Sequence, residues 1–216
     1  MDIKTTDELG QARGVKAIVY GRAGMGKTTL CGTAPRPLII SAEAGLMPLR
    51  RQRLPVIEIK SLTDLEKAYT WVTTSPQASH IDTICIDSLS EIAEVCLTAA
   101  KKATKDGRKA YGDYVDNMTP AIRGFRDLVG KNIVFTAKQG TSKDEFTGMT
   151  SFGPDVPGNV LGNNLPYFFD LVLNANVGVD GEGKRYHYLR TQPDMQYDAK
   201  ADRDWETRLY WFPALR

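Results

Sequence analysis

The sequence predicts an α/β fold with a mostly parallel central sheet, helices on its faces and antiparallel strands near the C-terminal end. Strand-like runs alternate with helical patterns over residues 15–137, as is typical of parallel sheets. A glycine-rich turn directly follows the first strand-like run. Late in the chain, Gly181-Glu182-Gly183 separates two further strand-like runs, which we expect to pair as a hairpin.

The first half of the chain contains clear starts and stops of elements. A strand at 15–20 leads through the glycine-rich turn into a short helix, which is ended by Pro35-Arg36-Pro37. Ser61 is a suitable N-cap for a helix that has one apolar face and stops near Pro76. Further strands are expected at residues 38–41, 56–59 and 81–87.

The second half is less regular. An amphipathic helix is expected after residue 87, and Pro120 is placed to begin another helix that runs to residue 129. Residues 138–166 contain five glycines and three prolines without periodicity, and so predict a long functional or mobile loop. The remaining runs predict strands at 133–137, 169–175 and 186–191, and a last apolar piece at 208–212.

Composition indicates an ordinary soluble globular protein. Of 216 residues, 42% are hydrophobic and 25% are charged, and the formal net charge is only +2, so nucleic-acid binding would need a local basic patch. No apolar run is long enough to span a bilayer and the first residues are polar, so we expect a cytoplasmic protein with no membrane partner. Residues 1–13 are interpreted as a polar tail and 14–216 as one domain. The cysteines are expected to be reduced core thiols, namely Cys31, Cys85 and Cys96.

Residues 21–28 read GRAGMGKT and fit the phosphate-binding pattern G-x-x-x-x-G-K-[ST]. The glycines let the backbone turn tightly and point successive N–H groups at an anion. Lys27 can reach the outer phosphates, and the Thr28 hydroxyl can ligate Mg²⁺, which prefers oxygen ligands. A surface turn with a chance lysine would not explain the flanking strand and helix. The expected cofactors are therefore ATP and Mg²⁺, held by Gly21, Arg22, Ala23, Gly24, Met25, Gly26, Lys27, Thr28 and Thr29.

Three polar residues follow predicted strands and are candidates for chemistry on the nucleotide. The Asp87 carboxylate can hold the magnesium shell, or it can cap the next helix. Glu43 can orient the water that attacks the γ-phosphate, or it can be an exposed loop residue. Gln139 can sense the γ-phosphate through an amide that donates and accepts, or it can be a solvated loop glutamine.

Two segments carry side chains that suit single-stranded DNA. The first combines cations for phosphates with tyrosines on which bases could stack, although a solvated helix end is an open alternative. The second lies in the glycine-rich segment, with a mobile unliganded loop as its alternative. The first segment contributes Lys101, Lys102, Lys105, Arg108, Lys109, Tyr111 and Tyr114, and the second contributes Phe146, Met149 and Phe152.

Cations far from the phosphate-binding loop in sequence can still act on it. Lys200 and Arg203 are candidate catalytic fingers, because cations supplied by the same chain or by a neighbour often stabilise the charge of a transferring phosphate. A surface pair is the alternative. His80 and His187 have no ligand-like partners in the sequence, and we assign them no role.

The order of these parts resembles the core of RecA-type recombination ATPases over about residues 15–203: GRAGMGKT, SAEAG, TICIDS, then VFTAKQ before a glycine-rich segment. The small size and the late QPDMQYDAKADR stretch are similar to phage single-strand annealing proteins built on a RecA-like core. The resemblance implies that Glu43 is the catalytic glutamate, Asp87 the second magnesium-site carboxylate and Gln139 the polar switch residue.

The resemblance also implies partners. Residues 101–116 and 140–163 would be the first and second DNA-binding loops, and Lys200 with Arg203 would cross a subunit interface in a homo-oligomeric ring or filament. Residues 14–216 would form a single RecA-like ATPase domain, found in the host cytoplasm if the gene is carried by a phage.

The sequence thus predicts an ATP-dependent protein that binds single-stranded DNA for annealing or recombination. Two alternatives stay open. A P-loop small-molecule kinase would use residues 101–114 as a substrate lid and would turn over with an acceptor and without DNA. A nucleotide-dependent adaptor or loader of a replication or packaging machine would bind nucleotide without turnover, and Glu43→Gln would not affect it.

Overall fold

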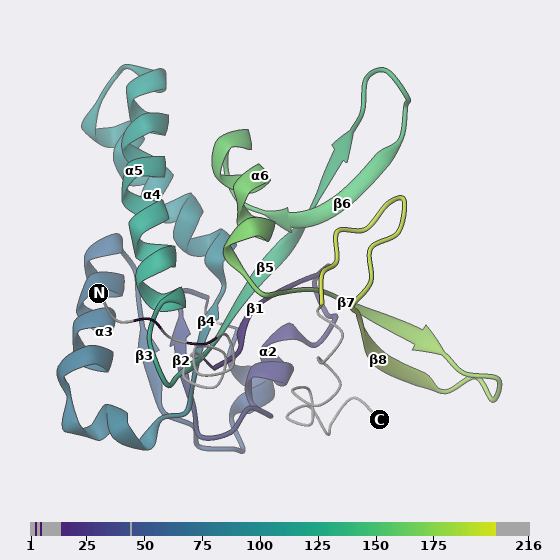
Figure 1. Ribbon diagram of the computed structural model, residues 1–216, viewed down its shortest axis with the longest axis horizontal. Helices are drawn as coiled ribbons and strands as arrows, with labels where there is room; N and C mark the ends of the chain where they lie inside the picture. The colour runs from purple at the N-terminus through teal and green to yellow at the C-terminus, as the bar shows by residue number, and fades with distance from the viewer. Residues whose placement is uncertain (1–2, 4, 6–13, 44, 202–216) are drawn as a thin grey trace.

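The computed structural model describes residues 3, 5, 14–43 and 45–201 and shows a twisted sheet with helices on both faces (Figure 1). The strands are β1 Lys16–Tyr20, β2 Pro37–Ser41, β3 Val56–Glu58, β4 Thr83–Asp87, β5 Asn132–Lys143, β6 Thr150–Asp155, β7 Leu171–Val179 and β8 Arg185–Arg190. The α-helices are α2 Lys27–Cys31, α3 Leu62–Thr74, α4 Leu89–Ala103, α5 Gly107–Arg126 and α6 Asn159–Phe168, and two short 3-10 helices are η1 Met47–Leu49 and η2 Pro76–His80.

The sheet has the order β3-β2-β4-β5-β1-β7-β8. All neighbours from β3 to β7 pair in parallel, whereas β8 pairs antiparallel with β7, and β6 pairs antiparallel with the far end of β5. The predicted α/β class with a mostly parallel sheet and antiparallel C-terminal strands is therefore confirmed. In this arrangement the carboxyl ends of β1, β2 and β4 meet the middle of β5, near Ala137, at one edge of the sheet, which is where ligands bind in such sheets.

Alternate side chains of the central strands enter two different cores, as the pleat of a strand requires. Ile18 and Tyr20 of β1 pack with apolar residues of α3, α4, α5 and α6 on one face. Ala17 and Val19 pack on the other face with Leu30 of α2 and the neighbouring strands. The central strands are buried on both faces, which explains why their sequences are continuous apolar runs.

The cysteines behave as the sequence indicates, since Cys31, Cys85 and Cys96 are all buried free thiols. Within the part of the chain that the structure describes, no helix is long and apolar enough to cross a bilayer.

Helix α5 begins much earlier than its sequence indicates. We expect a helix starting at Pro120, but α5 starts at Gly107 and Pro120 lies inside it. Asp106 caps the true start, where its carboxylate accepts bonds from the N–H groups of Arg108 and Lys109 at 2.9 and 3.3 Å. The apolar stripe that pulls this stretch against the sheet is Ala110, Tyr114, Met118, Ile122 and Phe125.

The predicted loop at 138–166 is wrong as well. Strand β5 continues to Lys143 and turns back into β6, and α6 follows. We call residues 138–155 the arm, because β5 and β6 leave the sheet there and project from the body as a hairpin (Figure 1). The outer part of the arm is largely exposed on both faces, so its sequence has none of the apolar alternation that would have indicated a strand.

Candidate nucleotide-binding site

The phosphate-binding loop lies between β1 and α2 at the carboxyl edge of the sheet. Gly24 and Gly26 both have φ near +80°, at 80° and 81°, a conformation that side chains disfavour. Gly21 faces the backbone of β7, and a Cβ there would lie 2.6 Å from the Ala175 carbonyl oxygen. The glycines of the pattern are thus required by the fold of the loop itself.

Lys27 folds back over this loop. Its Nζ donates to the carbonyl oxygens of Gly21 at 2.7 Å and Arg22 at 3.1 Å. Burial lowers the pKa of the Lys27 ammonium, while the nearby carboxylates of Asp87 and Glu43 act in the opposite direction. A partly desolvated cation at this position favours an anionic ligand, and phosphate oxygens would replace the loop carbonyls as its partners.

Asp87 and Thr28, the two predicted magnesium ligands, are in contact. The Thr28 hydroxyl donates to Asp87 Oδ2 at 2.8 Å, and the Thr136 hydroxyl of β5 donates to the other carboxylate oxygen. Asp87 is only 3% exposed, so the two hydroxyls hold it in one orientation at the end of β4. A hydroxyl and a carboxylate are hard oxygen donors that fit Mg²⁺, which takes most of its remaining ligands from water and phosphate.

Glu43 lies beside Asp87 because the ends of β2 and β4 are neighbours. Its carboxylate accepts a hydrogen bond from the hydroxyl of Ser88. Ser88 also caps α4, where its hydroxyl accepts from the Glu91 N–H at 3.3 Å, and the Asp87–Ser88 peptide is cis. The Glu43 carboxylate is therefore fixed by a residue that is itself fixed by the start of a helix.

Gln139 lies in β5, where the strand leaves the sheet and enters the arm. Its side-chain oxygen accepts from Asn174 Nδ2 of β7 at 3.3 Å, and its backbone is in register with Pro154 of β6. The neighbouring Lys138 bonds Glu91 and Glu94 of α4 at 3.2 and 2.9 Å. Gln139 thus lies at the base of the arm and also borders the same cavity as the phosphate-binding loop.

These side chains border one cavity of about 620 Å³, within the size range of small-molecule sites. The structure brings together residues of four strands, or of the loops that follow them, that are far apart in sequence. The cavity is lined by residues 21–29 together with Glu43, Pro48, Asp87, Ser88, Lys138 and Gln139.

Four contributors to the site, Thr136, Ser88, Asn174 and His187, carry weak or no sequence signals. Thr136 and Asn174 lie inside apolar strand runs of the sequence. A role is indicated only by their burial as polar side chains, which the structure shows. Ser88 is recognisable as a helix cap, not as a partner of Glu43. His187 has no local signal at all, since its neighbour in space is 162 residues away in sequence.

His187 lies on the phosphate-binding loop, although no local sequence pattern indicates a role for it. The hairpin of β7 and β8 brings its Nδ1 to 3.3 Å from the Met25 carbonyl oxygen. The same ring would lie 3.2 Å from a Cβ placed on Gly26. The imidazole therefore covers the bend of the loop that must hold the phosphates.

Replacing His187 by alanine is expected to weaken ATP binding by about three- to tenfold, the effect of losing one modest hydrogen bond. The loss would let the Met25–Gly26 backbone move. Titration of the protein with a fluorescent ATP analogue measures the effect. His80 is the matched control, because the chain has two histidines and His80 lies at the opposite edge of the sheet, at the end of η2 before β4. Equal affinities for His187→Ala and His80→Ala would contradict the assignment.

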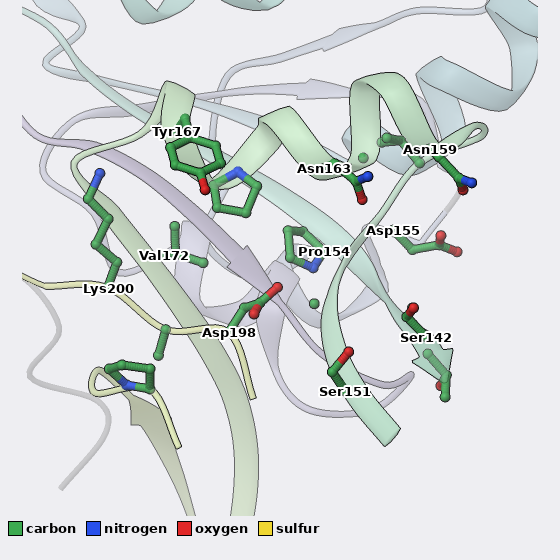
Figure 2. A pocket seen from close by; sticks show the side chains of 18 of the residues that line it. Ser142, Ser151, Pro154, Asp155, Asn159, Asn163, Tyr167, Val172, Asp198 and Lys200 are labelled. Atoms are coloured by element: carbon green, nitrogen blue, oxygen red, sulfur yellow. The ribbon is translucent and has the colours of Figure 1, made fainter. Parts of the chain in front are cut away.

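Lys200, one of the two cations expected to act as fingers, does not line this cavity. Lys200 Nζ donates to the Phe169 carbonyl oxygen at 2.8 Å, and its backbone pairs with Val172. Its side chain borders a second cavity of about 750 Å³ between the arm, α6 and the last described residues (Figure 2). Arg203 lies outside the described residues.

The structure leaves the cations of the first predicted DNA segment exposed, but it buries Tyr114, so the prediction is wrong at this residue. Lys101, with its Nζ 5.3 Å from the ring centroid of Tyr111, belongs to a set of exposed cations at the junction of α4 and α5. Tyr114 is 0% exposed because it lies on the apolar stripe of α5, so its ring cannot stack on a base. The exposed cations are Lys101, Lys102, Lys105, Arg108 and Lys109.

The second predicted DNA segment is the arm. Phe146 at its tip is fully exposed and Met149 is 42% exposed, whereas the Phe152 ring packs on Tyr197 with centroids 4.8 Å apart. The tip is an ordered turn, because the Asp144 carboxylate accepts from the N–H groups of Phe146 and Thr147 at 2.8 and 2.9 Å. These bonds hold the pKa of Asp144 below its usual value.

The parallel sheet, the glycine-rich loop after β1 and the carboxylates at the next strand ends define a P-loop nucleotide-binding protein. The chain belongs to a family described as an AAA domain, whose model matches residues 13–202. The match covers the loop, Glu43, Asp87, Gln139 and Lys200. A comparison with curated proteins found no match.

Proposed function

We propose that this protein is an ATPase that binds single-stranded DNA and uses the bound nucleotide to control annealing or strand pairing in recombination. One observation carries the proposal: β5 runs without interruption from the nucleotide cavity at Gln139 into the exposed arm. A change in the phosphates sensed by Gln139 would then reach a projecting surface through a single strand. The resemblance to RecA-type annealing proteins assigns DNA binding to this same segment.

Within the nucleotide site, each side chain has a distinct task. Lys27 would hold the outer phosphates, and Glu43 would orient the attacking water and accept its proton. Thr28 and Asp87 would hold Mg²⁺ directly or through its water ligands, and Mg²⁺, when bound, would neutralise charge on the phosphates. Gln139 would contact the γ-phosphate and so report whether the nucleotide is ATP or ADP.

The chemistry around the arm supports a single strand of DNA as the ligand. The cavity in Figure 2 lies beside the arm, and the amides of Asn159 and Asn163 on α6 border it together with the carboxylates of Asp155 and Asp198. Such groups suit the donors and acceptors of base edges better than they suit phosphates. The basic junction of α4 and α5 adjoins this cavity, because the Tyr111 ring lies against Gly158 at its rim, and its cations suit the backbone phosphates.

Oligomerisation follows from the same proposal. Lys200 borders the second cavity and not the phosphate-binding loop of its own chain, so any contact with the γ-phosphate would be made in a neighbouring copy. A ring or filament of copies would then place Lys200 and Arg203 at the nucleotide of the adjacent subunit. Light scattering with and without ATP measures this assembly.

Phe146→Ala is expected to weaken binding to single-stranded DNA by about fivefold or more, because stacking of a base on one ring contributes about 1–3 kcal/mol. Nucleotide binding should be unchanged, since the tip lies at the far end of the arm. Fluorescence anisotropy with a labelled oligonucleotide in the presence of a non-hydrolysable ATP analogue measures the affinity. Val129→Ala is the control, because Val129 is also exposed but lies before β5.

The decisive experiment is ATP hydrolysis with and without a long single-stranded DNA at two salt concentrations. Stimulation by DNA that weakens with salt supports the proposal. ADP release that depends on a small acceptor and ignores DNA would instead indicate the kinase, and nucleotide binding without turnover would indicate the adaptor or loader.

A further inference from the structure

The last described residues tie the arm to the body of the protein. We call residues 194–200 the strap. Its backbone forms two hydrogen bonds with the backbone of Phe152 in β6. The Phe152 N–H donates to Gln196 O at 2.6 Å, and the Asp198 N–H donates to Phe152 O at 2.9 Å. Two residues later, Lys200 and Val172 of β7 exchange backbone bonds of 2.8 and 2.9 Å. The strap therefore joins β6 of the arm to β7 of the central sheet.

Side chains reinforce this junction. The Tyr197 ring packs on Phe152, and the Arg190 guanidinium of β8 lies 4.5 Å from the centroid of the same tyrosine ring. Asp198 is so close to β6 that a Cβ on Gly153 would lie 2.5 Å from its carboxylate. Figure 2 shows Asp198 on the strap pointing toward the β6 segment that carries Pro154 and Ser151. The strap and the base of the arm thus form one packed unit.

Tyr20 connects this unit to the phosphate-binding loop. It is the last residue of β1, directly precedes Gly21, and is 0% exposed. Its hydroxyl lies 2.7 Å from the Asp198 carbonyl oxygen and 3.0 Å from the Phe152 carbonyl oxygen, and it donates to this pair. Burial raises the pKa of Tyr20 strongly, so the hydroxyl keeps its proton.

We propose that Tyr20 is a positioning residue that transmits occupancy of the phosphate-binding loop to the arm. Lys27 Nζ bonds the Gly21 carbonyl oxygen, and it must leave this partner when it turns to the outer phosphates. The released carbonyl belongs to Gly21, the residue directly after Tyr20, and the Tyr20 hydroxyl bonds both the arm and the strap. This route is separate from the one through Gln139, which reaches the arm along β5.

The test compares Tyr20→Phe with Tyr114→Phe. Both tyrosines are fully buried, but the Tyr114 hydroxyl has no hydrogen-bond partner in the described part of the chain. Each variant keeps its ring and loses one hydroxyl, so the pair isolates the bonds of Tyr20. Hydrogen exchange of residues 150–155 is measured with Mg²⁺ alone and with a non-hydrolysable ATP analogue plus Mg²⁺, and nucleotide affinity is measured in parallel.

In the wild type and in Tyr114→Phe, we expect the hydrogen exchange of β6 to change when the nucleotide binds. In Tyr20→Phe, this nucleotide-dependent change should be about five- to tenfold smaller, as expected for the loss of one coupling hydrogen bond. Nucleotide affinity should stay within about twofold, because the hydroxyl does not face the nucleotide cavity. If the Tyr20 hydroxyl had only a structural role, Tyr20→Phe would change the hydrogen exchange of β6 equally with and without nucleotide. A Tyr20→Phe response equal to the wild type, or a wild type without any response, would overturn the proposal.

If Tyr20→Phe does not fold, Tyr197→Ala tests the same link at its other end, because it loosens from Phe152 the strap whose Asp198 carbonyl accepts from Tyr20. The nucleotide-dependent change in β6 exchange should then be reduced as well. The physiological meaning of this link rests on the proposed DNA-binding function, but the exchange measurement contains no DNA. Failure of single-stranded DNA to bind would therefore count against the proposed function, whereas the exchange result alone decides the role of Tyr20.

Discussion

Lys27→Ala is expected to abolish measurable ATP binding, with a loss of a hundredfold or more, roughly the effect of two charge-assisted hydrogen bonds to phosphate. In the present conformation Lys27 Nζ already bonds two loop carbonyls, so the side chain is held where the phosphates must enter. Alanine would leave the loop amides without the cation that neutralises the outer phosphates. Isothermal titration with ATP and Mg²⁺ measures the loss.

The same substitution is expected to change how the stability of the nucleotide-free protein depends on pH. Burial lowers the pKa of Lys27, so the folded state binds this proton less firmly than the unfolded chain does. The resulting penalty exists at pH values below the lowered pKa and disappears as the pH rises to the unfolded value. The unfolding temperature of the wild type should therefore rise relative to that of Lys27→Ala as the pH increases from 7 toward the ordinary pKa of lysine.

Lys67→Ala is the control for both measurements, because Lys67 lies on α3 with a side chain that is 74% exposed. It should bind ATP like the wild type. ATP affinity retained in Lys27→Ala would remove the phosphate-binding loop as the basis of the nucleotide site.

The nucleotide site was predictable because its parts are local signals at strand ends. The GRAGMGKT pattern specifies its own backbone, and Glu43 and Asp87 each follow an apolar run. Parallel strands place their carboxyl ends at one edge, so residues 44 positions apart in sequence must become neighbours once both runs are strands of one sheet. The contact between Glu43 and Ser88 is the product of that rule.

The arm and the true start of α5 could not be predicted from local sequence patterns. A strand is recognised in a sequence by the alternating apolar residues of one buried face. The outer arm has no buried face, so its glycines and prolines dominate the sequence pattern. In α5, Pro120 resembles a helix start, but Asp106 caps the helix earlier and the buried stripe outweighs one missing backbone bond. The charge and aromatic content around Tyr114 predict a DNA contact, but the sequence does not show the direction of its side chain, which the fold turns into the core.

Tyr20 and His187 illustrate a third limit. Tyr20 reads as an ordinary apolar strand residue, and its partners at Phe152 and Asp198 follow 132 and 178 positions later. His187 reads as one residue of an exposed strand, and only the fold of the β7–β8 hairpin brings it to Met25. Contacts of this range depend on the whole topology, so no local pattern predicts them.

Glu43→Gln is expected to leave ATP binding intact and to lower turnover by about a hundred- to ten-thousandfold, the range of general-base contributions. The substitution keeps the shape of the side chain, and the glutamine oxygen can still accept the hydrogen bond that Ser88 donates to Glu43. The amide cannot accept a proton from the attacking water. A phosphate-release assay combined with nucleotide titration separates turnover from affinity, and Glu58→Gln on the edge strand β3 is the control.

This variant also distinguishes the proposed function from its alternatives, because it holds the protein in the ATP-bound state. If ATP orders the arm for single-stranded DNA and hydrolysis releases it, Glu43→Gln must retain labelled oligonucleotide longer than the wild type at saturating ATP. A kinase would lose phosphate transfer without any change in DNA retention. An adaptor that does not turn over ATP would show the same behaviour in variant and wild type, because the carboxylate would have no proton to accept.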